Sequence, residues 1–350
     1  MKPWMLEYLN CPSCKGALKN EVSRENEYGI EEGYLLCKDC SRSYPIVRNI
    51  PRFVPPEFYD QGVRDMKTMD SSLGSKTFQG LRKTAEYFGF EWETFGRFGW
   101  DDPIFNLERE KIVFENKSLM KEKEFSGSLV LDAGCGNGRY SYWAAAMGAE
   151  VIGIDIGRGV ESAFRNTRHL RNIHICQADI FNPPFRENKF DLIFSIGVLM
   201  HTCDARSAFR SLIRYLKVGG FITIHMYHKG NIIYEISDRL LRTFSTKLSP
   251  QVLYKISVRI HPFLRVLEKA GILRILNAFI RLPSSHPHII FDWYSAPFAS
   301  HHTYAEIFEW CNEFGVKIEK TNERNISLLR KIIHPIMALT VKSKKVSCIS

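Results

Sequence analysis

The chain has 350 residues, of which 45% are hydrophobic and 25% charged; this balance is typical of folded globular proteins and excludes wholesale disorder or a collagen-like fibre. It carries 48 Lys and Arg against 38 Asp and Glu, a formal net charge of +10, and is long enough for two domains. No apolar run reaches the roughly 18 residues of a transmembrane helix and the first residues do not resemble a signal peptide, so we expect a cytoplasmic protein.

The positive charge is unevenly distributed along the chain. Residues 1–126 contain 19 basic and 21 acidic residues, whereas residues 228–300 contain 10 basic and 4 acidic ones and are rich in Leu and Ile. Such a segment attracts anions, which could be phosphate-bearing substrates, nucleic acid or an acidic membrane surface. The alternative is a solvated basic face on amphipathic helices.

Two C-x-x-C pairs, CPSC and CKDC, are separated by 22 residues near the N-terminus. In a cytoplasmic chain such pairs indicate a metal site more often than disulfides, and four thiolates form the closed tetrahedral site that structural zinc prefers. We therefore expect residues 1–56 to form a zinc ribbon whose small core depends on Zn²⁺. The polar segment Glu21 to Gly33 is expected to form its hairpin tip. The predicted ligands are Cys11, Cys14, Cys37 and Cys40.

The stretch CKDCSRSYPIVRNIPRF, from Cys37 to Phe53, resembles the small zinc-ribbon family that activates or precedes several methyltransferases. The resemblance implies a ribbon that packs beside a catalytic domain and takes no part in the chemistry.

Residues 57–126 contain no metal or phosphate motif, but the stretch FGFEWETFGRFGWDD is densely aromatic. Aromatic side chains at this density usually pack, which predicts a helical cap against the next domain. The alternative is a wall that faces the substrate, with Trp92 as a contact.

From Leu129 onward, short apolar strands alternate with helical segments, which predicts an α/β fold with a mostly parallel, doubly wound sheet. In such sheets the ligand lies beyond the carboxyl ends of the strands. The loop after the first strand has the spacing G-x-G-x-G, at Gly134, Gly136 and Gly138, and not the G-x-G-x-x-G of dinucleotide sites. The expected strands are 129–131, 150–155, 173–177, 190–196 and 219–226.

The segments VLDAGCGNGR, VIGIDI and QADI together resemble the class I S-adenosylmethionine-dependent methyltransferases. The resemblance covers residues 127–227 and 301–345, and it implies a Rossmann-like sheet with an antiparallel last strand and S-adenosyl-L-methionine as cofactor. The glycine loop would border the methionine part, Asp155 the ribose hydroxyls and Asp179 the adenine. The cofactor-binding residues that it implies are Asp132, Gly134, Gly136, Gly138, Asp155, Ile156, Asp179, Ile180 and Ser195.

Polar residues also follow the fourth and fifth predicted strands, where His201, His225 and Tyr227 are candidate bases or substrate contacts. A structural role is the alternative for each histidine. The tetrapeptide Asn182 to Phe185 resembles the N-P-P-F motif of amino-group methyltransferases. It precedes the fourth strand instead of following it, so we interpret it as a loop.

Residues 228–300 are expected to form a helical insert, or lid, over the acceptor. Its last part, DWYSAPFASHHT, is similar to a segment in bacterial methyltransferases of natural-product and surface-polysaccharide gene clusters. That similarity implies contacts to the acceptor from Asp292, Tyr294 and His301. A second metal site at His286, His288, His301 and His302 is the alternative, and Thr303 begins a helix through a capping box.

These features predict a methyltransferase that acts on a small-molecule or glycan-type acceptor of anionic or amphipathic character. Such an enzyme mainly aligns the acceptor, and a base is needed chiefly for a hydroxyl. One alternative is an rRNA guanine methyltransferase whose ribbon contacts RNA. The other is a cofactor-binding scaffold protein without activity.

Overall fold

The computed structural model describes residues 1–58, 75–323 and 338–347. A seven-stranded sheet in the order β10-β11-β9-β8-β5-β6-β7 forms its centre. Strand β11 runs antiparallel to the other six strands, which are parallel to one another. The predicted mostly parallel sheet with an antiparallel last strand is therefore confirmed. The strands are β5 (Leu129–Ala133), β6 (Glu150–Asp155), β7 (Ile173–Gln177), β8 (Phe190–Ile196), β9 (Leu216–Tyr227), β10 (Val316–Thr321) and β11 (Ala338–Lys345).

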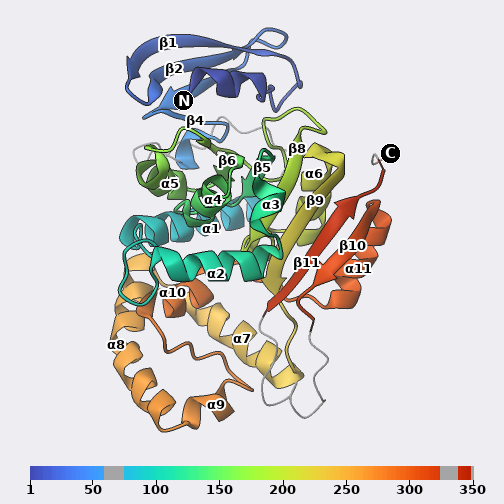
Figure 1. The fold of residues 1–350 in the computed structure, drawn as a ribbon. Helices are drawn as coiled ribbons and strands as arrows, with labels where there is room; N and C mark the ends of the chain where they lie inside the picture. Colours follow the sequence, from blue (N-terminus) through green and yellow to red (C-terminus); the bar gives the residue numbers. More distant parts are fainter. Residues whose placement is uncertain (59–74, 324–337, 348–350) are drawn as a thin grey trace.

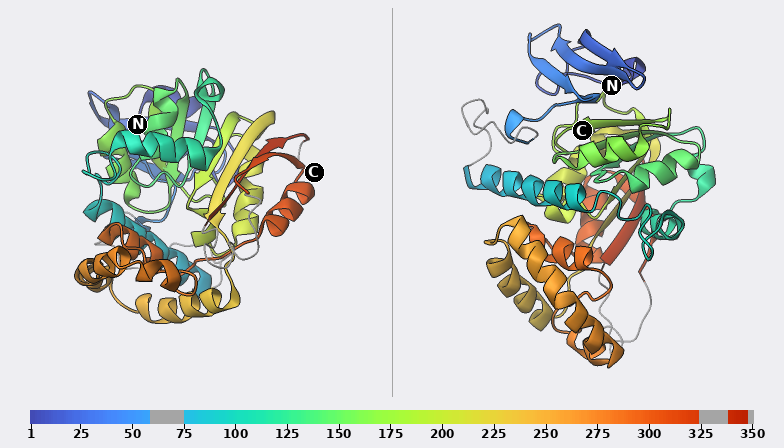
Figure 2. Two further views of the ribbon diagram at one scale, coloured as in Figure 1. Left: turned by 60° about the horizontal axis from the view of Figure 1, so that its bottom comes forward. Right: turned by 90° about the vertical axis from the view of Figure 1, so that its left-hand side faces the viewer.

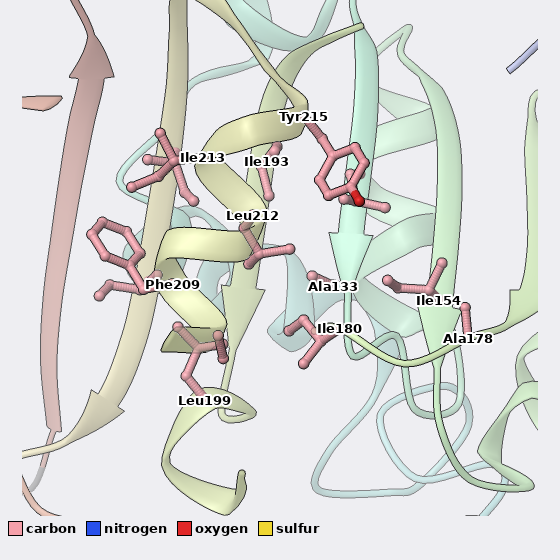
Figure 3. Packing of buried hydrophobic residues seen from close by; sticks show 14 of the residues in the cluster. Ala133, Ile154, Ala178, Ile180, Ile193, Leu199, Phe209, Leu212, Ile213 and Tyr215 are labelled. Atoms are coloured by element: carbon pink, nitrogen blue, oxygen red, sulfur yellow. The ribbon is translucent and has the colours of Figure 1, made fainter. Parts of the chain in front are cut away.

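Helices cover both faces of this sheet (Figure 1). On one face, the side chain of Phe114 packs in a cluster with residues of β5, β6 and β8; on the other, Phe209, Leu212 and Ile213 pack against Ile193 (Figure 3). The first face carries α2 (Leu107–Ser118), α4 (Arg139–Ala146) and α5 (Gly159–Thr167), and the second carries α6 (Ala205–Tyr215) and α11 (Tyr304–Glu313). Helix α11 begins after Thr303 with the capping box that the sequence predicts.

The N-terminal ribbon is a separate antiparallel sheet in the order β1-β2-β3-β4, at the top of Figure 1. The segment expected as its hairpin tip is mostly strand, since the turn is confined to Glu27 and Tyr28. Most of β1 is exposed to solvent, so polar side chains are compatible with a strand there. The ribbon comprises η1 (Pro3–Glu7), β1 (Leu18–Asn26), β2 (Gly29–Cys37), β3 (Ser43–Val47) and β4 (Ile50–Pro51), followed by η2 (Pro56–Phe58).

The ribbon docks on the loop from Asn182 to Phe185, between β7 and β8. The backbone N–H of Asn10 donates to the carbonyl of Pro184 at 2.8 Å, and Lys15 Nζ donates to the Asn182 side chain at 2.6 Å. Phe185 is buried in the same hydrophobic cluster as the core of the ribbon. The N-P-P-F sequence is therefore a loop, as predicted, and it holds the ribbon.

A second contact joins the ribbon to the strand ends of the main sheet through Arg52, whose side chain is fully buried. Its guanidinium donates to the Gln177 side chain at 2.9 Å and forms an ion pair with Glu161 at 2.5 Å. Gln177 Nε2 in turn donates to the carbonyl of Ile156 at 2.9 Å. The ribbon is thus linked by hydrogen bonds to the residue that follows Asp155.

The insert forms the end of the molecule opposite the ribbon (Figures 1 and 2). It consists of α7 (Ile232–Ser245), α8 (Pro250–Lys269), α9 (Ile272–Leu276) and α10 (Pro287–Ser295). Helix α10 packs against α7, α8 and also α1 (Ser75–Thr94), which crosses the middle of the molecule. None of the described helices is long and apolar enough to cross a membrane.

Candidate functional site

A cavity of about 220 Å³ lies at the carboxyl ends of β5 to β9. Helix α1 and helix α10 complete its walls, together with the short η3 (Leu199–His201). Most of the residues predicted for cofactor and acceptor meet in this one space. Those that line it are Trp92, Gly134, Gly136, Asp155, Ile156, Asp179, Ile180, His201, His225, Tyr227 and Asp292.

The loop after β5 requires glycine for both backbone and spatial reasons. Gly134 and Gly136 have φ angles of +97° and +51°, which side chains other than glycine rarely adopt. A Cβ at Gly134 would lie 2.2 Å from Val198, and one at Gly136 would lie 2.9 Å from the ring of Trp92. The backbone of this loop therefore forms the wall of the cavity without intervening side chains.

Asp155 stands at the end of β6 with its carboxylate at the cavity. One oxygen accepts the N–H of Gly136 at 3.1 Å and the other accepts the N–H of Gly157 at 2.9 Å. A carboxylate has about four lone-pair sites, so each oxygen can also accept a hydroxyl group. Burial raises the pKa of Asp155, as it does the pKa of Asp179 at the end of the next strand. The carboxyl groups of Asp155 and Asp179 therefore fit the diol and the base of a nucleoside.

Three of the residues predicted for the cofactor lie behind the cavity wall. Asp132 accepts a hydrogen bond from Ser141 at 2.6 Å, and Ser195 donates to the carbonyl of Ala133 at 2.8 Å. Gly138, with a φ of +82°, is the residue before α4. None of the three is among the residues that line the cavity.

The three predicted catalytic residues, His201, His225 and Tyr227, all reach the cavity. His201 Nδ1 lies 2.8 Å from the carbonyl of Phe298; a carbonyl only accepts, so this nitrogen carries the proton and Nε2 is left as an acceptor. Burial lowers the pKa of His201 to about 3 and that of His225 well below its usual value. Both imidazoles are neutral near pH 7.

Two of the four predicted acceptor contacts, Trp92 and Asp292, line the cavity, while Tyr294 and His301 are directed elsewhere. The hydroxyl of Tyr294 donates to the carbonyl of Arg281, and His301 Nδ1 lies 2.7 Å from Glu235 Oε2. Both therefore hold the insert together.

The cavity also contains ionisable groups that the sequence motifs do not mark as part of the site. Glu91 lies 2.7 Å from His288 Nε2; burial raises the pKa of Glu91 to about 8 and lowers that of His288 to about 4, so both are neutral near pH 7. Arg139 forms an ion pair with Glu110 at 3.0 Å and lies over the ring of Trp92. Two features of the sequence could have identified these groups. Glu91 is a carboxyl group in a stretch of aromatic residues, and Arg139 directly follows the glycine loop.

The four cysteines of the ribbon come together, with their sulfur atoms within 4.8 Å of one another. The Cys11–Cys40 and Cys14–Cys37 sulfur pairs are 3.7 and 3.3 Å apart. Four sulfurs at 2.3 Å from a central zinc would be about 3.8 Å apart, so the cluster fits this ion. Within residues 1–58, 75–323 and 338–347, this is the only group of His, Cys, Asp and Glu that could hold a metal. The four histidines weighed as a second site form no such group.

The strand order, the glycine loop after β5 and the acids after β6 and β7 define a Rossmann-like fold of the methyltransferase type. Residues 124–259 match the family model described as "Methyltransferase domain", and residues 2–49 match the model described as "Trm112p-like protein". The chain therefore carries a methyltransferase domain preceded by a ribbon of the methyltransferase-activator type. Both resemblances drawn from the sequence are confirmed.

Curated relatives share only part of this chain. A demethylmenaquinone methyltransferase of Staphylococcus haemolyticus is 34% identical over 125 residues, which are 34% of this chain and 51% of the relative. A tRNA U34 carboxymethyltransferase of Sulfurovum is 27% identical over 184 residues, 52% of this chain and 60% of the relative. The chain thus spans between half and two thirds of the length of these two proteins.

Two solved structures match about three quarters of this chain at low sequence identity. The magnesium protoporphyrin IX methyltransferase of Synechocystis with bound S-adenosylhomocysteine has a TM-score of 0.44 at 18% identity, and the match covers 77% of this chain and 99% of that one. A complex that contains the Haloferax volcanii Trm112 methyltransferase activator has a TM-score of 0.45 at 12% identity, and the match covers 75% of this chain and 99% of that chain.

Proposed function

We propose that this protein transfers a methyl group from S-adenosyl-L-methionine to a small-molecule or glycan-type acceptor. The observation that carries the proposal is the single cavity in which the glycine loop, Asp155 and Asp179 meet His201 and Asp292. A cofactor half and an acceptor half that share one space are what an in-line displacement requires.

The cofactor supplies a methyl group that is already electrophilic on its sulfonium. With the cofactor bound, Asp155 would accept the ribose hydroxyls, the backbone of the glycine loop would border the methionine part, and Ile156 and Ile180 would flank the base. Trp92 on α1 packs on the loop at Gly136 and restricts the access of water to this half of the cavity. The main contribution of the chain is therefore alignment of the acceptor and exclusion of solvent.

For a hydroxyl acceptor the site also needs a group that takes a proton. Burial raises the pKa of Asp292 to about 6 and lowers the pKa of His201 to about 3. A base works best when its pKa lies near the operating pH. Asp292 is therefore the better base, and His201 Nε2 serves as an acceptor that orients the hydroxyl group.

In the ribbon, Zn²⁺ on the four thiolates would supply folding energy and no chemistry, because four protein ligands leave no open coordination position. Its place at the far side of the sheet from the insert supports a structural role (Figure 1).

The alternative is methylation of RNA, favoured by the formal net charge of +10 and by the relatives named as tRNA U34 carboxymethyltransferases. Against it stands the distribution of charge, because the ribbon and cap contain slightly more acidic than basic residues.

The experiment that separates these functions follows a labelled methyl group from the cofactor into polar metabolites, glycans, lipids and total RNA. We expect label in a small-molecule or glycan fraction and none with Asp155→Ala. Label in RNA would establish the alternative, and no transfer to any fraction by a protein that binds the cofactor would indicate a scaffold.

A further inference from the structure

The insert exposes an unusual amount of apolar surface. Fourteen of the twenty exposed large hydrophobic side chains in the described part of the chain lie between Ile232 and Phe279. They follow helical spacing: Ile232, Ile236, Leu240 and Phe244 on α7 are each more than half exposed. On α8 the stripe contains Val252, Ile256, Ile260 and Phe263. Exposed apolar stripes along helices are a mark of interaction sites.

Helix α7 has the reverse of the usual orientation for a helix in water. Besides Tyr234 it buries the polar residues Asp238, Arg242 and Ser245, while most of its aliphatic side chains point outward. Asp238 pairs with Arg242 and accepts a hydrogen bond from Trp293 of α10, and Ser245 donates to the carbonyl of Tyr294 in the same helix. Helices that face water normally bury their apolar stripe. The outward stripe of α7 is therefore matched to an apolar environment outside the protein.

Basic residues surround these stripes. Seven lysines and arginines of α7, α8, α9 and their connections are exposed. Most acids of the insert form ion pairs: Asp238 with Arg242, Glu235 with His301 and Glu268 with Arg265. The exposed bases are Arg239, Lys247, Lys255, Arg259, Arg265, Lys269 and Arg274. An apolar stripe flanked by Lys and Arg is the pattern of helices that lie in the interface of an anionic bilayer.

We propose that the exposed faces of α7, α8 and α9, here called the basic–apolar face, dock on the surface of an anionic lipid bilayer. A second copy of the chain is a poorer occupant, because a two-fold contact would place one positively charged face against another. RNA is also a poorer occupant, because eleven of the fourteen exposed side chains are aliphatic and single-stranded RNA is bound by aromatic stacking.

Helix α10 connects this face to the cavity. His288 and Asp292 line the cavity, while Trp293 of the same helix donates to Asp238 of α7 at 2.9 Å. A membrane under α7 and α8 would thus lie one helix away from the acceptor half. The docking itself requires neither cofactor nor methyl transfer, so it can fail or hold independently of the proposed function.

The test is co-sedimentation of the full chain with phosphatidylcholine vesicles that contain or lack phosphatidylglycerol, at low and high salt. We expect binding only to the vesicles with phosphatidylglycerol, weakened by salt. The triple variant Arg239→Ser, Lys255→Ser, Arg259→Ser should weaken binding about 10- to 100-fold, given the contribution of each basic residue near an anionic surface. The triple variant Ile236→Ser, Leu240→Ser, Phe263→Ser should weaken it at least as much.

Matched controls remove exposed groups of the same kind elsewhere. Ile104→Ser, Ile112→Ser, Val218→Ser and, separately, Lys123→Ser, Lys317→Ser, Lys320→Ser should leave vesicle binding unchanged. Equal loss with these controls, or no binding to anionic vesicles by the wild-type chain, would overturn the proposal. If light scattering shows a dimer that the substitution Leu240→Ser dissociates, the face binds a second copy of the chain. If RNA competes with the vesicles for this face, the face binds nucleic acid.

Discussion

At the scale of single residues, the cavity is defined by carboxyl groups that are buried and face a common space. Burial raises the pKa of Glu91 to about 8 and that of Asp292 to about 6, and it also raises the pKa of Asp155. Each of these groups is costly to ionise without a partner. Such groups are typical of functional sites, where the environment adjusts the pKa to the chemistry.

Asp292→Asn tests the role of this carboxyl group as a base. Because an acid with a pKa of about 6 is deprotonated above that pH, kcat/KM of the wild type should rise with pH to a plateau above about 6. The variant should lose this ascending limb and about 100- to 10,000-fold in kcat. Tyr294→Phe, which alters a residue outside the cavity, should keep the limb. An unchanged pH profile in Asp292→Asn would exclude Asp292 as the base.

Residues tied to a local backbone motif could be predicted from the sequence, and residues that packing brings together could not. Gly134, Gly136 and Asp155 follow from the spacing of a glycine loop and the next strand end. Glu91 and His288 are 197 positions apart and meet only because α1 packs against α10. No local pattern encodes that pairing.

At the scale of elements, the ribbon is fixed to the sheet by buried polar contacts as well as by apolar packing. Arg52 contacts Gln177 at the end of β7 and Glu161 on α5, and the Asn182–Phe185 loop contacts the first residues of the ribbon. The ribbon and the methyltransferase domain therefore share one continuous core.

Arg52→Met should lower the free energy of unfolding by about 2–4 kcal/mol, because it leaves the buried Gln177 side-chain oxygen without its donor and leaves Glu161 paired only with the exposed Arg48. Urea denaturation measures this value. Arg24→Met, which removes the ion pairs of this exposed arginine with Glu31 and Glu32, should cost less than about 1 kcal/mol. Equal effects of the two substitutions would show that Arg52 does not hold the ribbon on the sheet.

The sequence predicted the strands of the main sheet because they are buried on both faces and read as apolar runs. It did not predict β1, whose side chains are mostly exposed and polar, so the segment resembled a loop. The insert was predicted as helical from its spacing, yet the outward direction of its apolar stripe on α7 depends on what the helix packs against.

At the scale of the whole molecule, the ribbon packs on the sheet through a shared core that includes Cys11 and Cys37, at the end opposite the insert. The ribbon and the insert lie at opposite ends of the molecule (Figure 2). The cavity lies at the carboxyl ends of the strands, with walls completed by α1 and α10. Loss of the metal should therefore affect stability more than cofactor binding.

Cys37→Ser tests this separation. Elemental analysis should find about one zinc per wild-type chain and much less in the variant, whose melting temperature should fall because the ribbon loses a ligand. Affinity for S-adenosylhomocysteine should stay within about threefold, or 0.7 kcal/mol. Cys203→Ser, outside the cluster, should change neither zinc content nor stability in this way. A variant that keeps its zinc would contradict the four-thiolate site.

The most direct test of the account is calorimetric titration of the full chain with S-adenosylhomocysteine. The cavity at the carboxyl ends of β5 to β7 predicts one binding site in the wild type and a loss of about 2–4 kcal/mol, or roughly 30- to 1,000-fold in Kd, in Asp155→Ala. Glu187→Ala, an exposed carboxylate paired with Arg214, should bind as the wild type does. No binding by the wild type, or equal binding by Asp155→Ala, would contradict the assignment of the cavity.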